Sequence, residues 1–163
     1  MYKDSFKYKG QILNGNIRDG YGTLKREPID DDALCFKYEG PFQNDLMGEG
    51  PGELIIHHCG ETPLLHFKGG FKHSLFNQYG SLVTPDYTYE GHFVEGRKCG
   101  SGKIKHPFYC YEGIWLDDDM QGPGTLAQDL TVFTGQMVKN KKDSGILKLA
   151  NGDEYHGKFD QES

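Results

Sequence analysis

Large apolar and small residues alternate with polar ones over short stretches of the chain. In the segment 111–115, Tyr111, Gly113 and Trp115 stand at positions i, i+2 and i+4. On a β-strand these three residues share one face, whereas a helix would distribute them around its axis. The segment 122–126 repeats the spacing after the polar stretch 117–121. The pattern predicts a β-hairpin with one aromatic face and one polar face.

The hairpin pattern recurs along the chain. An aromatic residue, a variable residue and a glycine begin each unit, and the last five starts lie 22 residues apart after intervals of 30 and 29. The starts are Tyr8, Tyr38, Phe67, Tyr89, Tyr111, Phe133 and Tyr155. Two residues after each of these glycines stands a large apolar residue: Ile12, Phe42, Phe71, Phe93, Trp115, Met137 and Phe159. We therefore expect six complete hairpins and a half repeat, with thirteen strands, in one domain spanning 1–163.

Composition supports the same fold class. The chain has 23 glycines among 163 residues and 13% aromatic residues, and glycine weakens a helix interior by about 1 kcal/mol relative to alanine. The sequence therefore predicts an all-β protein: a single-layer, twisted antiparallel sheet of tandem hairpins that forms an elongated, solenoid-like array.

The repeated order Tyr-Glu-Gly-x-Trp/Phe, a short turn and Gly-x-Gly-x-Leu resembles the MORN repeat over roughly residues 8 to 159. The units that start at 89 and 111 fit closely. Ser74 and Gln78 in the third unit, and Asn140 and Ser144 in the sixth, replace usual glycines, so we expect altered turns there. The resemblance implies a scaffold or adaptor role, and its known settings include the cytoskeleton, cilia, motor adaptors and membrane junctions.

The expected function is to bind a protein segment, either a peptide or an amphipathic helix, on the aromatic face. A single-layer sheet leaves an apolar face without a second layer, and exposed apolar patches mark interaction sites. Trp115 is the expected hot spot, so Trp115→Ala should abolish binding while the fold survives. The Asp117–Asp119 turn should favour a basic partner. The full predicted site is Trp115, Phe93, Phe71, Met137, Tyr89, Tyr111, Asp117, Asp118 and Asp119.

Two alternatives accompany this prediction. A membrane-associated tether would recognise anionic phospholipids through basic residues, namely Arg97, Lys98, Lys103, Lys105, Lys139, Lys141 and Lys142. A homodimer could form through the open edge of the half repeat at 155. The insertions at 25–36 and 55–65 are either tolerated loops or partner contacts.

Catalysis, metal binding and nucleic-acid binding are not expected. His57, His58, Cys59 and His66 are near in sequence, but their spacing matches no standard zinc site. No nucleophile, phosphate-binding or metalloprotease motif occurs, so we expect no enzyme activity and no cofactor. A net charge of -6 disfavours nucleic acid as a partner. The start at Met1 has no apolar signal segment, which predicts a cytoplasmic protein, with association to cytoskeleton, cilium or membrane as a further expectation.

Overall fold

The computed structural model describes residues 5–27, 34–58 and 61–159. Within these ranges the chain forms β-strands and turns and no helix, so none that could cross a membrane. The all-β, antiparallel hairpin fold is thereby confirmed. The internal contacts divide the chain into two compact units, Met1–Pro85 and Asp86–Ser163, which are described separately. That the whole chain is one domain stays a prediction.

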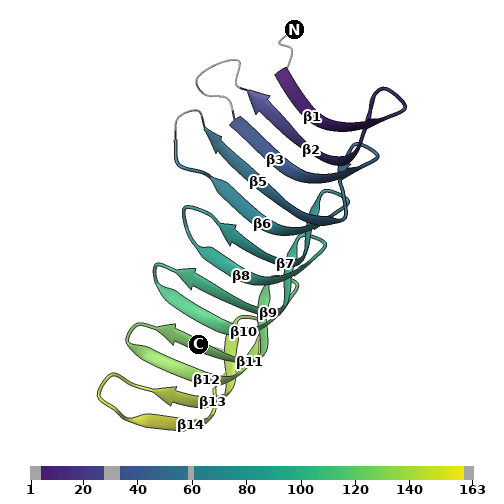
Figure 1. Cartoon of the computed structure of the whole chain (residues 1–163). Coiled ribbons are helices and arrows are strands. Elements are labelled where there is room, and N and C mark those ends of the chain that lie inside the picture. The colour runs from purple at the N-terminus through teal and green to yellow at the C-terminus, as the bar shows by residue number, and fades with distance from the viewer. Residues whose placement is uncertain (1–4, 28–33, 59–60, 160–163) are drawn as a thin grey trace. The chain divides into compact units, whose positions relative to one another are not determined.

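The first unit is an open antiparallel sheet with the order β1-β2-β3-β5-β6-β7 (Figure 1). Its strands are β1 (Ser5–Leu13), β2 (Ile17–Glu27), β3 (Leu34–Gln43), β4 (Leu46–Met47), β5 (Gly50–His58), β6 (Leu65–Lys72) and β7 (Leu75–Val83). The two-residue strand β4 pairs only with β3. It was not expected, and it arises because the return half of the second hairpin leaves the sheet at residues 48 and 49.

The second unit is an open antiparallel sheet with the order β8-β9-β10-β11-β12-β13-β14. Its strands are β8 (Thr88–Val94), β9 (Arg97–His106), β10 (Tyr109–Leu116), β11 (Asp119–Gln128), β12 (Thr131–Val138), β13 (Lys141–Lys148) and β14 (Glu154–Lys158). In the register of β10 with β11, Tyr111 lies opposite Leu126 and Gly113 opposite Gly124. The half repeat at 155 forms β14, which pairs with β13.

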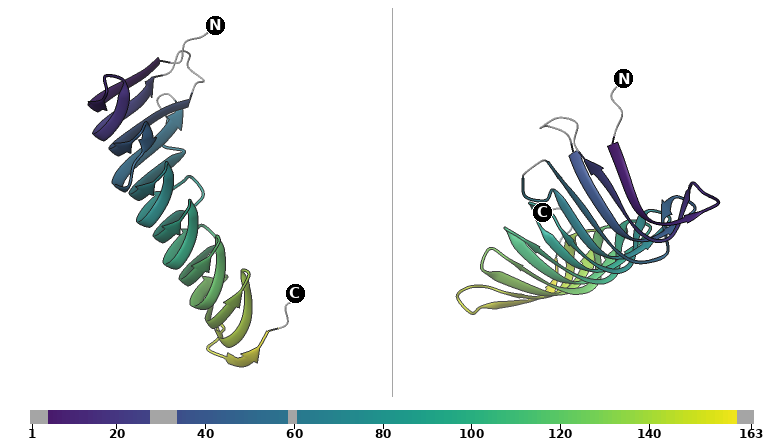
Figure 2. Two further views of the ribbon diagram at one scale, coloured as in Figure 1. Left: turned by 90° about the vertical axis from the view of Figure 1, so that its right-hand side faces the viewer. Right: turned by 45° about the horizontal axis from the view of Figure 1, so that its top comes forward.

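The strands of both units are strongly curved (Figure 2). On a straight strand, side chains at i and i+4 would lie about 13 Å apart. Yet the ring centroids of Tyr111 and Trp115 are 5.3 Å apart, and those of Phe67 and Phe71 are 5.1 Å apart. The rings therefore lean along the strand, and the strand bends towards the face that carries them. The rings of each bent hairpin pack on one another and on a ring of a neighbouring hairpin, as Trp115 does on Tyr111 and Tyr89.

Paired glycines make room for this core. A Cβ atom on Gly124 would lie 2.4 Å from the Tyr111 ring, and a Cβ on Gly102 would lie 2.2 Å from the Tyr89 hydroxyl. The rings thus lie flat over backbone that carries no side chain. Tyr111 is 0% exposed, and its hydroxyl donates a hydrogen bond to the backbone oxygen of Ile114 at 3.1 Å. Burial of this ring raises the pKa of the Tyr111 hydroxyl.

Two glycine replacements keep the backbone that glycine would adopt. Ser74 and Asn140 have φ values of 65° and 67°, close to the 66° and 71° of Asp45 and Asp118 at the same turn position. Positive φ at both central residues defines the type I′ turn. The altered turns expected at Ser74 and Asn140 are therefore wrong. Gln78 likewise keeps a positive φ of 60°.

Ser144 belongs to a return strand that differs from the others. In β12–β13 the register shifts between Gln136 and Met137, where β10–β11 shifts between Gly113 and Trp115. The reason is visible in the sequence. Gly145 follows Phe133 by 12 residues, while Gly124 follows Tyr111 by 13.

The second insertion lengthens the β5–β6 hairpin, in which Ile56 lies opposite Leu65. Part of the first insertion, residues 28–33, and Cys59 lie outside the described residues. A contact of either insertion with a partner stays a prediction.

Candidate functional site

The aromatic side chains predicted to bind a partner belong to the core. Their exposed fractions are Phe71 1%, Tyr89 1%, Phe93 2%, Tyr111 0%, Trp115 3% and Met137 1%. The indole of Trp115 packs edge-on against Tyr89 at 5.4 Å, and its Nε1 donates to the backbone oxygen of Gly102. The expected exposed groove is therefore wrong, because rings of successive hairpins close the face by packing on one another.

The predicted acidic cluster also has an internal role. Asp118 Oδ1 accepts hydrogen bonds from the backbone nitrogen of Lys98 at 3.0 Å and from Lys98 Nζ at 3.2 Å. Asp119 accepts from Asn140 Nδ2, and Asp117 Oδ1 lies 3.6 Å from Arg97 Nη1. These carboxylates thus join neighbouring hairpin turns, and binding of a basic partner at them stays a prediction.

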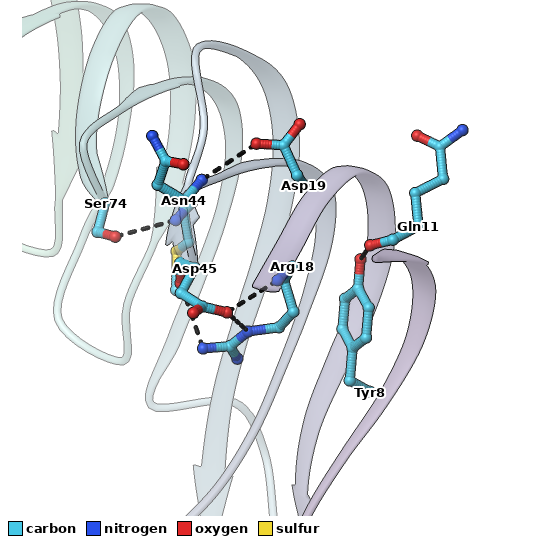
Figure 3. Close-up of polar contacts among 8 residues, drawn as sticks. Tyr8, Gln11, Arg18, Asp19, Asn44, Asp45 and Ser74 are labelled. Atoms are coloured by element: carbon cyan, nitrogen blue, oxygen red, sulfur yellow. Dashed lines mark hydrogen bonds and ion pairs between the residues drawn. The ribbon is translucent and has the colours of Figure 1, made fainter. Parts of the chain in front are cut away.

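Asp118 represents a repeated contact that sequence reasoning missed. In each case the second residue of a hairpin turn donates its backbone N–H to the backbone carbonyl of one residue in the preceding hairpin. Its side chain accepts a hydrogen bond from the backbone N–H of that partner residue. The first unit has the pairs Asp45 with Arg18 (Figure 3) and Ser74 with Met47. The second unit has Asp118 with Lys98 and Asn140 with Met120. We call these pairs the turn ladder.

The turn ladder left a signal in the sequence. Asp, Ser, Asp and Asn occupy one column, and these are short side chains with a hydrogen-bond acceptor that tolerate positive φ. The hydrogen bond from the Arg18 backbone, followed by that from its side chain, lowers the pKa of Asp45. The guanidinium Nε lies 2.9 Å from Asp45 Oδ1, as Figure 3 shows.

Several of the basic residues proposed for lipid binding are held by acidic neighbours. Lys98 is 14% exposed, bridges Asp118 and lies 5.4 Å from the Trp115 ring. Lys103 Nζ lies 2.7 Å from Glu112, and this hydrogen bond raises the pKa of Lys103. Arg97 faces Asp117, and Lys142 lies over Phe133 at 6.0 Å. Lys105, Lys139 and Lys141 are exposed.

The histidines near the second insertion have other partners. His66 Nε2 lies 2.8 Å from Glu53 Oε1, and this contact lowers the pKa of Glu53. His57 Nδ1 lies 2.8 Å from the backbone oxygen of His58. Across the described ranges, no three His, Cys, Asp or Glu side chains gather as metal ligands would.

An exposed apolar surface lies elsewhere, at the turns that connect the hairpins of the second unit. Phe108 in the β9–β10 connection is 74% exposed, and Leu130 in the β11–β12 connection is 86% exposed. Beside these tips, Cys110, Ala127 and Val132 are successive cross-strand neighbours on the face opposite the rings. We call these five residues the connecting-turn patch.

Positive charge borders the connecting-turn patch. Lys105 lies opposite Cys110 and Lys148 opposite Val132, so a lysine stands at each end of the row. A shallow hollow beside the row is lined by Lys103, Cys110, Glu112, Thr125 and Ala127. No part of this patch was predicted, because Phe108 and Leu130 stand outside the repeated aromatic columns.

Comparison with known proteins agrees with the repeat geometry. The family model of the MORN repeat matches residues 89–107 and 111–127, which cover the fourth hairpin and most of the fifth. No curated protein sequence matches the chain. MORN repeats are non-catalytic modules that are generally associated with binding to proteins or membranes. The chain thus contains two MORN repeats, at residues 89–107 and 111–127, and its other hairpins carry ring columns and paired glycines in the same register.

Proposed function

We propose that this protein is a non-catalytic scaffold that holds an acidic amphipathic helix of a partner protein on the connecting-turn patch. The observation that carries the proposal is the pair of exposed apolar tips, Phe108 and Leu130, at equivalent places in successive connections. Isolated exposed apolar residues are common, but a patch of neighbouring ones marks an interaction site.

The spacing of the tips suits a helix. The two connections are two strands apart, which corresponds to about 9.6 Å. Residues i and i+7 of an α-helix lie on one face about 10.5 Å apart. Two apolar residues at that separation can therefore contact Phe108 and Leu130 together.

Charge selects an acidic helix over a basic one. Lys105 and Lys148 border the apolar row, and like charges would repel the flanks of a basic helix. Lys105 carries most of this charge argument, because Lys148 Nζ already lies 2.9 Å from Glu154. Leu130 also has a φ of 63°, a left-handed conformation in which its Cβ atom crowds the following carbonyl oxygen. Burial does not account for a leucine at this exposed turn, since its side chain is 86% exposed.

Cytoskeletal, motor and ciliary proteins are the partner classes that the MORN resemblance suggests, and a cytoplasmic location remains a prediction. The phospholipid alternative is less favoured, because Arg97, Lys98 and Lys103 face carboxylates of the chain.

The test is affinity purification with wild-type protein and the Leu130→Asp variant, followed by mapping of the bound segment. Support requires that the segment is an acidic amphipathic helix and that Leu130→Asp reduces its affinity at least about tenfold, the effect of about 1.4 kcal/mol. Leu46→Asp, at an exposed site in the first unit, is the matched control. Equal binding by both variants, a non-helical segment, or binding only to anionic vesicles would overturn the proposal.

A further inference from the structure

A second exposed surface lies on the first unit, on the face opposite its core rings. Tyr21 of β2 and Tyr79 of β7 are 59% and 53% exposed, and both line one hollow of about 530 Å³. The rest of its apolar lining consists of a proline and three glycines: Pro51, Gly52, Gly69 and Gly80. We call the surface formed by these six residues the tyrosine hollow.

A charged row runs beside the tyrosines. Five polar residues of successive strands lie opposite one another on this face: Thr23, Glu39, Glu53, Lys68 and Ser81. Tyr21 and Tyr79 stand two residues before the first and the last of them, so they occupy a parallel row on the same face. An apolar row and a charged row therefore lie side by side.

The backbone beneath the tyrosine hollow is already paired. Strands β2, β3, β5 and β6 each have a hydrogen-bonded strand on both sides, so an extended ligand cannot join them as a further strand. Side chains must bind it instead. A polyproline II helix suits such a surface, because it has no internal hydrogen bonds and packs its proline rings against aromatic side chains.

The spacing of the tyrosines suits the same conformation. In the order β2-β3-β5-β6-β7 the two tyrosine strands are four positions apart, which corresponds to about 19 Å. A polyproline II helix rises about 3.1 Å per residue with three residues per turn, so residues i and i+6 share a face about 19 Å apart. Prolines at i and i+6 can therefore contact Tyr21 and Tyr79, while a proline at i+3 lies over the glycines.

The charged row selects a ligand with a positive charge. Glu39 and Glu53 lie directly opposite each other, and like charges in that position are unfavourable. Lys37 Nζ lies 2.9 Å from Glu39 Oε2, at one carboxylate. His66 Nε2 lies 2.8 Å from Glu53 Oε1, at the other. A carboxylate accepts several hydrogen bonds, so both can also bind a guanidinium. With Lys68, the hollow is bordered by two carboxylates and one ammonium, which favours an arginine over an acidic side chain.

We propose that the tyrosine hollow binds a proline-rich segment of another polypeptide in the polyproline II conformation. The segment has prolines at i, i+3 and i+6, and an arginine between them that contacts Glu39 and Glu53. This site goes beyond the helix-binding function, because it lies on the first unit and uses none of the connecting-turn patch.

The experiment uses the whole protein and a fluorescently labelled peptide, Ala-Pro-Ala-Ala-Pro-Arg-Ala-Pro-Ala. We expect it to bind, measured by anisotropy, and to shift the amide resonances of Gly52, Gly69 and Gly80. A peptide of the same composition with its prolines moved out of the three-residue spacing should bind at least about tenfold more weakly. Replacement of the arginine by glutamate should also weaken binding.

Protein variants separate the tyrosine hollow from other exposed rings. Tyr21→Ala and Tyr79→Ala should each weaken binding at least about tenfold, and their melting temperatures should stay close to wild type because both rings are exposed. Phe108→Ala, at an exposed ring of the second unit, is the matched control and should bind the peptide as wild type does. Since Phe108 belongs to the connecting-turn patch, the two proposals can fail separately.

Several results would overturn the proposal. These are no binding at millimolar peptide, equal affinity for the two proline spacings, and tighter binding of the glutamate peptide. Amide shifts confined to the second unit, or wild-type affinity in both tyrosine variants, would also contradict it.

Discussion

Asp118 of the fifth hairpin and Lys98 of the fourth are joined by a reciprocal pair of hydrogen bonds. The Asp118 backbone N–H donates to the Lys98 carbonyl at 3.1 Å, and the Lys98 backbone N–H donates to Asp118 Oδ1 at 3.0 Å. The same geometry joins Asn140 to Met120. The Asp118 side chain thus accepts a backbone hydrogen bond that a backbone carbonyl would accept in a regular sheet. It links the turn of one hairpin to that of the next.

Loss of the Asp118 side chain should destabilise the second unit. Asp118→Ala leaves the Lys98 N–H without its acceptor, which corresponds to about 1–2 kcal/mol of unfolding free energy. Asp118→Asn should be close to wild type, since Asn140 makes the equivalent contact in the next hairpin. Urea denaturation followed by circular dichroism would measure both.

The matched control is Asp117→Asn. Asp117 has a φ of 50° and its carboxylate is 67% exposed, 3.6 Å from Arg97. Asn tolerates that backbone, and an exposed ion pair is worth little. If Asp117→Asn destabilises as much as Asp118→Ala, the turn ladder is not the source of the effect.

Acid should weaken the first unit through Asp45. The hydrogen bonds from Arg18 lower the pKa of Asp45 in the folded protein. The unfolded chain therefore binds the proton more readily, and stability from this contact is present above the unfolded value of about 3.9. This contribution to stability is lost as pH falls through the lowered pKa of Asp45 in the folded protein.

The measurement is the melting temperature of wild type and Asp45→Asn between pH 7 and pH 2. Asn keeps an acceptor for the Arg18 N–H but does not titrate, so the variant should lose less stability on acidification. Parallel curves for the two proteins would show that other groups cause the acid dependence.

The strand positions were predictable because ring and glycine columns report directly on strand periodicity. Tyr111 with Leu126 and Gly113 with Gly124 follow from a spacing of two residues on each strand. The direction of the bend was not predictable from spacing. Alternation predicts that Tyr111 and Trp115 share a face. It does not predict that the strand bends towards that face until the two rings are in contact.

The candidate site was harder to predict for a related reason. Trp115 and Phe93 are aromatic residues of the kind found at binding hot spots. Only their burial in the folded chain shows that they belong to the core. Leu130 and Phe108 stand outside the repeated columns, so periodicity gave no reason to single them out. The turn ladder depends on contacts 20 to 27 residues apart in sequence, which appear only after the hairpins are stacked.

A methyl group on Gly124 should disturb the core more than its size suggests. Gly124→Ala places Cβ 2.4 Å from the Tyr111 ring, far inside van der Waals contact, and overpacking costs about 1–3 kcal/mol. Thr125→Ala, one position along on the opposite face, should cost less. Thermal melts of the two variants would compare them, and equal melting temperatures would contradict a ring fixed over Gly124.

Trp115→Ala should remove a large part of the stability of the second unit instead of merely removing a binding contact. The side chain is 3% exposed, packs on Tyr89 and Tyr111, and donates a hydrogen bond. Truncation of such a residue costs about 3–5 kcal/mol, a large part of the 5–15 kcal/mol that stabilises a typical domain. A drop of that size in unfolding free energy, measured by urea denaturation, would confirm this. A folded variant with only partner binding lost would restore Trp115 as a surface residue.

Leu130→Asn should stabilise the second unit while it removes part of the connecting-turn patch. Leu130 has a φ of 63° and follows Asp129 at 48° in a type I′ turn. Asn is favoured there, whereas the Cβ atom of most other residues is strained by about 1–2 kcal/mol. At 86% exposure the leucine recovers little of that cost by burial. We therefore expect a gain of about 0.5–1 kcal/mol in unfolding free energy, measured by urea denaturation.

The same variant should bind the helical partner more weakly, so the two effects have opposite signs. Asp129→Asn, at the first turn position, should change neither. A loss of stability in Leu130→Asn would mean that the leucine is retained for folding and not for a partner.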